Sequence, residues 1–162
     1  MTRICLDTSA YSNFRRGEAA AVDAIRRAKW VGLSTVVLGE LRTGFQLGSR
    51  ADVNEAELRA FLAEPVVEIL DIDDETSRHY ADIVVALRKA GTPIPTNDVW
   101  IAASGARHGA QVVTFDEHFR RIERVATIVL ERHRTPLRTA RRASTRARGA
   151  TTSKLRDRRR DR

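Results

Sequence analysis

The sequence predicts an α/β fold built on a mostly parallel sheet whose two faces are covered by helices. Short, wholly apolar runs alternate along the chain with segments of helical period, as expected for strands that are buried on both faces. The 162 residues allow one domain of ordinary size, and 42% of them are apolar, which is enough for a core. Because no run of 18 apolar residues occurs, we expect no membrane segment.

The first half of the chain contributes two predicted strands and two predicted helices. Residues 3–7 (RICLD) and 30–34 (WVGLS) are apolar runs of strand length. Helical spacing of apolar residues follows at 35–45 and, after a polar loop around 48–52, at 53–64.

The second half continues the alternation. A third strand is predicted at 66–70 and a long amphipathic helix at 74–91, which ends in glycine. Another helix at 97–109 leads to a fourth strand at 110–115, and a fifth strand is predicted at 126–130. The sheet therefore has four to five strands.

The net charge of +8 is divided unevenly along the chain. Residues 132–162 hold 13 Lys and Arg against 2 Asp, a net of +11, whereas residues 1–131 hold 16 basic and 19 acidic side chains, a net of −3. The basic segment has almost no large apolar residues, so we expect a disordered tail that follows a folded domain at residues 1–131. Such a tail is either a solvated extension or an arm that holds polyanions nonspecifically.

The start of the chain and its cysteine content favour the cytoplasm. The first residues pass directly into the first predicted strand, without the pattern of a secretory signal. Cys5, the only cysteine, lies between Ile4 and Leu6 and cannot form an intramolecular disulfide. We expect a cytoplasmic protein.

Three aspartates fall where the predicted strands end. Ligands of open α/β sheets bind at the carboxyl ends of the strands. Asp7 closes the first strand, and Asp116 follows the fourth. Asp98 lies in the first turn of a helix, where the helix dipole favours an anion and Thr96 or Asn97 can cap the helix. All three are expected at the same edge.

Glu40 interrupts the apolar stripe of the predicted helix at 35–45, four residues after Val36 and four before Gly44. A carboxylate on the core-facing side is costly without a cation, hydrogen bonds or a proton. Arg42 lies about 200° around the helix from Glu40 and cannot be its partner. A metal ion is the better partner.

Four acids at one edge without a basic residue among them would repel one another unless a divalent cation lies between them. Oxygen ligands suit Mg²⁺ or Mn²⁺, and such an ion supports hydrolysis of a phosphodiester bond. Each aspartate alone is weak evidence, because an aspartate at a strand end or helix start is more often structural. His118 follows Asp116 closely, but we interpret it as an exposed histidine at a helix start.

Four segments together resemble the PIN-domain ribonucleases, in particular the VapC toxins of bacterial toxin–antitoxin systems. The segments are LDTSAYSN, LSTVVLGELRTG, PIPTNDVWIAASGARHGAQVVTFDEHF and RIERVATIVL, and they span essentially residues 3 to 130. The resemblance implies a three-layer α/β/α sandwich that binds Mg²⁺ or Mn²⁺ and cuts RNA endonucleolytically. The basic tail departs from the family pattern, since such toxins usually end shortly after the last strand.

The resemblance also implies roles for individual residues. The catalytic and metal-binding acids would be Asp7, Glu40, Asp98 and Asp116, with Asp7 and Asp98 the firmest ligands. Contacts to substrate, or to these acids, would come from Thr8, Ser9, Asn97 and Thr114.

Partners follow from the same resemblance. Family members commonly form homodimers and are inhibited by a small antitoxin, VapB, that docks a peptide across the acidic cleft and brings the toxin to operator DNA. The leading hypothesis is therefore a metal-dependent endoribonuclease toxin. The alternatives are a noncatalytic nucleic-acid-binding protein that binds through its tail, and a co-repressor that acts with an antitoxin; the complete acidic set argues against the first of these.

Overall fold

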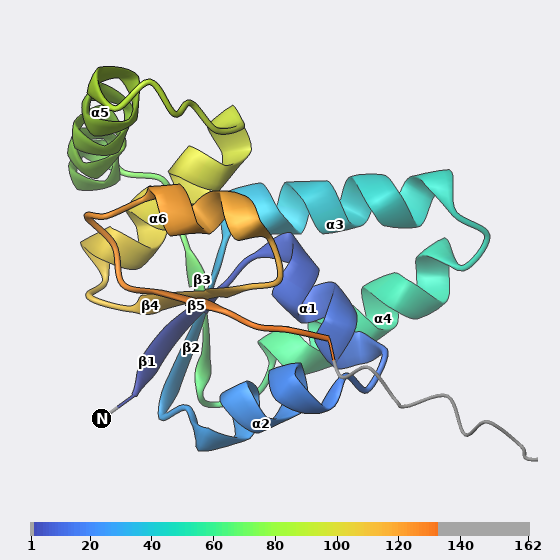
Figure 1. Cartoon of the computed structure of the whole chain (residues 1–162). Helices are drawn as coiled ribbons and strands as arrows, with labels where there is room; N and C mark the ends of the chain where they lie inside the picture. The colour runs from blue at the N-terminus through green and yellow to red at the C-terminus, as the bar shows by residue number, and fades with distance from the viewer. Residues whose placement is uncertain (1, 133–162) are drawn as a thin grey trace, which may run out of the picture.

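The computed structural model describes residues 2–132, which form a five-stranded sheet in the order β3-β2-β1-β4-β5 (Figure 1). Every pair of neighbouring strands is parallel, so the predicted α/β fold with a mostly parallel sheet is confirmed. The strands are β1 (Arg3–Leu6), β2 (Trp30–Ser34), β3 (Val67–Leu70), β4 (Gln111–Thr114) and β5 (Thr127–Val129).

Helices cover both faces of the sheet and give the three layers. Figure 1 shows α5 and α6 on one side of the strands and α1, α2 and α4 on the other. The helices are α1 (Thr8–Arg15), α2 (Ala19–Arg27), α3 (Thr35–Leu47), α4 (Ala51–Leu62), α5 (Asp74–Lys89) and α6 (Thr96–Arg107), followed by a short 3₁₀ helix, η1 (Glu117–Arg121). Among residues 2–132, no helix is both long enough and apolar enough to cross a membrane.

The two helices between β1 and β2 are absent from the prediction. Their sequence offers few large apolar residues at helical spacing, and α1 has only eight residues. Asp7 caps α1 by accepting a hydrogen bond from the backbone N–H of Ala10. Gly17, with φ of +77°, allows the chain to turn from α1 into α2.

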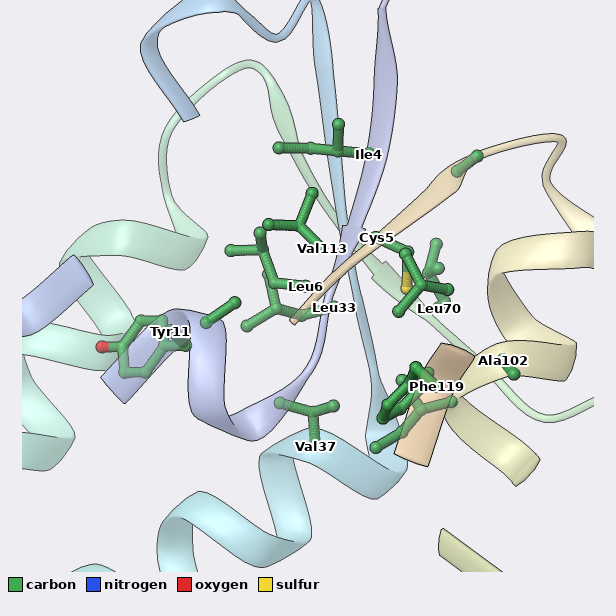
Figure 2. Close-up of a cluster of buried hydrophobic side chains, with 14 of the residues drawn as sticks. Ile4, Cys5, Leu6, Tyr11, Leu33, Val37, Leu70, Ala102, Val113 and Phe119 are labelled. Carbon is green, nitrogen blue, oxygen red and sulfur yellow. The ribbon is translucent and has the colours of Figure 1, made fainter. Parts of the chain in front are cut away.

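The core lies on both faces of the central strands (Figure 2). Successive side chains of β1 and β4 point to opposite faces of the sheet, and those of Ile4, Cys5, Leu6, Val112 and Val113 are all buried. Because both faces are covered, the sequence of each strand is a continuous apolar run. Cys5 is a free thiol within this core, as expected, and burial raises its pKa to about 12.

Helix α6 lies unusually close to the sheet. A Cβ atom at Gly105 would be 2.8 Å from the side chain of Val112, so only glycine allows this approach. The contact fixes α6 against β4, and it thereby fixes the position of Asp98 in the first turn of α6 relative to the end of that strand. The predicted domain edge at residue 131 and the basic tail at 132–162 are not tested, because residues 133–162 lie outside the described residues.

Candidate active site

The structure brings the predicted acids to the carboxyl-terminal edge of the sheet. Asp7 directly follows β1, and Asp116 follows β4 after one intervening residue. Asp98 is the third residue of α6, and Glu40 lies on α3, the helix that begins where β2 ends. This is the edge at which open α/β sheets bind their ligands.

Asp7 is the most deeply placed of the four acids, with 4% of its surface exposed. Its carboxylate accepts hydrogen bonds from Ala10 N at 2.7 Å, from Ser9 Oγ at 2.9 Å and from Thr114 Oγ1 at 2.6 Å. Burial raises the pKa of Asp7, the charge of Asp116 raises it further, and the three hydrogen bonds oppose this shift. The site therefore holds a desolvated carboxylate in one fixed orientation.

Two hydroxyls join the ends of β1 and β4. Thr114 is fully buried, and its Oγ1 accepts a hydrogen bond from Asp116 N at 2.8 Å. Ser9 Oγ accepts one from Phe115 N at 2.8 Å. Asp116 in turn caps η1, because its Oδ1 accepts from His118 N at 2.8 Å. The sequence predicts Ser9 and Thr114 beside the acids, and the structure places both there.

Asp98 is half-buried, and its pKa is raised to about 6. Burial is the largest cause, followed by the negative charges of Asp116, Asp7 and Glu40, while the nearby His118 lowers the pKa. The other three carboxylates therefore all act on Asp98 electrostatically. Within residues 2–132, none of them forms an ion pair with a lysine or arginine.

Glu40 differs from its predicted environment. It is half-buried at the margin of the core rather than inside an apolar stripe, and Gly44, one turn further along α3, is exposed. Its carboxylate accepts hydrogen bonds from Thr8 Oγ1 and, at 2.7 Å, from Asn97 Nδ2. Arg42 points away, as predicted, and binds Glu55 instead.

The predicted cap of α6 is wrong. The helix begins after Pro95, which offers no side-chain cap, and neither Thr96 nor Asn97 accepts from the first turn. Proline suits this position because it ends an extended segment with a fixed φ. The Asn97 side chain is thereby free to reach Glu40, so the amide links α6 to α3 across the site.

Three of the side chains converge closely enough to share a cation. Ligand atoms of Asp98, Asp116 and His118 all lie within 4.8 Å of one another. His118 Nδ1 lies 3.1 Å from Asp116 Oδ1, and this nitrogen is itself buried although the side chain of His118 is 45% exposed. Two carboxylates and an imidazole without a basic neighbour fit a divalent ion such as Mn²⁺ or Mg²⁺.

Comparison with known proteins decides the family. The model of the PIN domain matches residues 4–125, a span that contains all four acids and their hydrogen-bond partners. The chain belongs to the PIN domain family. The predicted resemblance to PIN-domain ribonucleases of the VapC type is confirmed, because curated relatives of this PIN domain carry that name.

Relatives of this PIN domain match it over almost their whole length. Ribonuclease VapC4 of Mycobacterium tuberculosis is 34% identical over 130 residues, which cover 79% of this chain and 97% of the relative. The toxin–antitoxin structure VapBC-5 of the same organism is 28% identical, with a TM-score of 0.60 and coverage of 78% and 97%. DNA-bound VapBC of Salmonella typhimurium has a TM-score of 0.69 at 24% identity, covers 79% and 98%, and supports the fold alone.

The site of this PIN domain includes His118, which the sequence did not predict as a site residue. His118 is only partly exposed, and it joins Asp98 and Asp116 in the one group of possible metal ligands found among residues 2–132, whereas Asp7 and Glu40 lie outside that group. Its sequence signal is its place two residues after Asp116, where η1 turns the imidazole back toward the aspartate. Sequence spacing alone could not distinguish this arrangement from an exposed histidine.

Proposed function

We propose that the protein is a cytoplasmic endoribonuclease toxin of the VapC type, which hydrolyses RNA phosphodiester bonds with Mg²⁺ or Mn²⁺. The observation that carries the proposal is the convergence of Asp7, Glu40, Asp98 and Asp116 without a lysine or arginine ion pair among the described residues. Family membership supports it, because VapC relatives are named ribonucleases.

The chain's own residues divide the work of the site. Asp98 and Asp116 would hold the ion together with His118, and Asp7, oriented by Thr114, would add a carboxylate from the other strand end. When bound, the ion would lower the pKa of an attacking water and offset the charge of the scissile phosphate.

Glu40 and its partners would fix the other wall of the site. Its carboxylate is oriented by Thr8 and Asn97, which come from α1 and α6. That arrangement leaves the carboxylate available as a further ligand or as a hydrogen-bond acceptor for the attacking water. Since the hydroxyl and the amide bind Glu40 directly, their role in this proposal is to position the acid.

Partners follow from the family. A VapB-like antitoxin is the inhibitor we propose, because the solved VapBC-5 structure, which is 28% identical to this chain, belongs to a toxin–antitoxin system. Operator DNA would be reached only through that antitoxin. A homodimer is the assembly we propose for the toxin itself.

Cleavage of RNA by the purified full chain tests the proposal. Cleavage should require added Mg²⁺ or Mn²⁺ and stop in excess chelator. Asp98→Asn should abolish it while thermal melting shows an intact fold, and Asp23→Asn, an exposed aspartate on α2, is the matched control that should cleave normally.

Two outcomes would contradict parts of this proposal. Cleavage that persists undiminished in chelator would exclude the metal. RNA binding without cleavage under all metal conditions would favour the alternative, a noncatalytic nucleic-acid-binding protein or co-repressor that uses the net charge of +11 in residues 132–162.

A further inference from the structure

A cavity lies between α1, α3 and α4. Its volume is about 410 Å³. It extends from Tyr11 on α1 and Leu41 on α3 to Arg50 and Asn54, which lie where α3 passes into α4. The catalytic acids are not among the residues that line it.

The phenol of Tyr11 is the unexplained group in this cavity. Tyr11 is 2% exposed, and its hydroxyl oxygen is buried without a hydrogen-bond partner. Figure 2 shows this oxygen on the side of the ring that faces away from the other labelled core side chains. An unpaired buried hydroxyl is costly, so this oxygen is a candidate donor to a group bound in the cavity. Burial raises the pKa of Tyr11, which keeps the hydroxyl as a donor.

The arginines that line the cavity favour an anionic ligand. Arg15, Arg16 and Arg50 line the cavity together with one acid, Glu57. Glu57 is paired with Arg15 at 2.6 Å. Arg16 and Arg50 form no ion pair with any residue in the described part of the chain. The charges that act on the Tyr11 hydroxyl itself are those of Arg15, Glu57 and Glu55. Phosphate oxygens accept hydrogen bonds from the guanidinium groups of arginine and from hydroxyl groups.

The cavity shares two helices, α1 and α3, with the acidic site. Thr8, which binds Glu40, precedes Tyr11 by three residues on α1, or about 4.5 Å along the helix axis. On α3, Leu41 of the cavity is the neighbour of Glu40 itself. A nucleic-acid strand that runs from the acids along α1 and α3 would carry a phosphate toward these arginines.

We infer that this cavity binds a backbone phosphate of the RNA substrate, on one side of the scissile bond, through Tyr11, Arg16 and Arg50. The inference rests on the proposed function, and it assigns the electropositive subsite that the acidic site itself lacks. Tyr11 and the arginines carry no sequence information, because phosphate contacts position a strand rather than read its bases.

Single neutral phosphates in the RNA provide the test. Once the cleavage position is mapped, oligonucleotides with one methylphosphonate at each flanking position are bound to the full chain carrying Asp98→Asn. One position should weaken binding to this protein. When Arg50→Gln is added, the same methylphosphonate should weaken binding little further, because the contact between Arg50 and this phosphate is already lost. Tyr11→Phe should weaken binding of unmodified RNA about threefold to tenfold.

Matched variants separate this contact from general charge. Arg27→Gln removes one exposed arginine of α2 outside the cavity, and Tyr80→Phe removes the chain's other phenol hydroxyl. In both variants, the same methylphosphonate should still weaken RNA binding. Arg50→Gln should also reduce the slope of log affinity against log salt by about one for unmodified RNA. An RNA that carries the methylphosphonate at the sensitive position should not show this reduction.

Three results would overturn the inference while leaving the nuclease assignment intact. The first is metal-dependent cleavage in which no methylphosphonate position depends on Arg50. The second is stabilisation of the fold by inorganic phosphate that requires Arg50, with RNA binding unchanged, which would assign the cavity to the free anion. The third is a Tyr11→Phe defect confined to antitoxin binding. A protein that neither binds nor cleaves RNA would instead reject the proposed function itself.

Discussion

Thr114 and Asp7, 107 residues apart in the sequence, are joined by a buried hydrogen bond of 2.6 Å from Thr114 Oγ1 to Asp7 Oδ2. The same hydroxyl accepts from the backbone N–H of Asp116 at 2.8 Å. One threonine thus fixes both acids that close the adjacent strands β1 and β4. Because a hydroxyl has one donor and two acceptor positions, threonine or serine can do this and an apolar residue cannot.

Thr114→Val should destabilise the protein near neutral pH by about 1–3 kcal/mol, because it leaves a buried carboxylate without its shortest hydrogen bond. The pKa of Asp7 should rise further, since the bond from Thr114 is the largest influence that lowers it. Thr114→Ser is the control and should retain most of the stability. Chemical denaturation at pH 7 measures both; equal stability of the valine and serine variants would contradict the role of the hydroxyl.

The raised pKa of Asp98 predicts a pH dependence of the metal-free protein. Its pKa is about 6 in the folded chain against an ordinary value of 3.8, so the folded state binds the proton more tightly. The stability that this proton contributes is fully present below pH 3.8 and is lost as the pH rises through 6. The folded protein in chelator should therefore lose stability between about pH 4 and pH 6.5 through this group.

Melting temperatures in chelator across that range provide the measurement. Asp98→Asn has no proton to lose, so the difference between its melting temperature and that of the unmodified protein should grow as the pH rises through 6. Asp23→Asn should show a constant difference, because Asp23 is exposed on α2. A gap between Asp98→Asn and the unmodified chain that does not change with pH would contradict the assigned electrostatic cluster.

The site was predictable from the sequence to the extent that strand ends determine it. Asp7 and Asp116 close apolar runs, and Asp98 opens a helix, so a parallel sheet brings them to one edge whatever the details. The environment of Glu40 was predicted less well, because helical spacing shows which face a residue occupies but not where along α3 the neighbouring elements stop. Its partners Thr8 and Asn97 come from two other helices.

The missed features depend on contacts that have no local pattern. Helix α1 packs against the sheet and against α4, where the Tyr11 and Phe61 rings lie 5.4 Å apart, and α2 packs on α1. Such tertiary contacts override weak helical periodicity. The sequence indicates an exposed His118, because none of its immediate neighbours shows that it meets Asp98, which lies 20 residues earlier in the chain. The packing of α6 on β4 brings the two residues together.

His118→Gln should weaken binding of Mn²⁺ by about tenfold or more and affect Mg²⁺ less, because imidazole suits Mn²⁺ better than Mg²⁺. Calorimetric titration of the purified chain with each ion measures the difference. His79→Gln on α5, far from the three convergent ligands in sequence, is the control and should bind both ions normally. Equal losses for the two ions would show that His118 only orients Asp116, whose Oδ1 lies 3.1 Å from His118 Nδ1.

The basic tail predicts a separation of binding from catalysis. Residues 1–131 carry a net charge of −3 and the acids lie together, so the metal-free domain should repel RNA, whereas residues 132–162 carry +11. Phosphates gathered by such a segment release counterions, so affinity should fall steeply with salt. Deletion of residues 134–162 should leave the melting temperature and the cleavage position unchanged, yet weaken RNA binding at low salt and flatten its salt dependence.

An unchanged salt slope would make the tail an inert extension, and a changed cleavage position would show that it carries specificity. Because the α1–α3–α4 cavity is retained in the truncated chain, its methylphosphonate effect should persist there and become easier to measure.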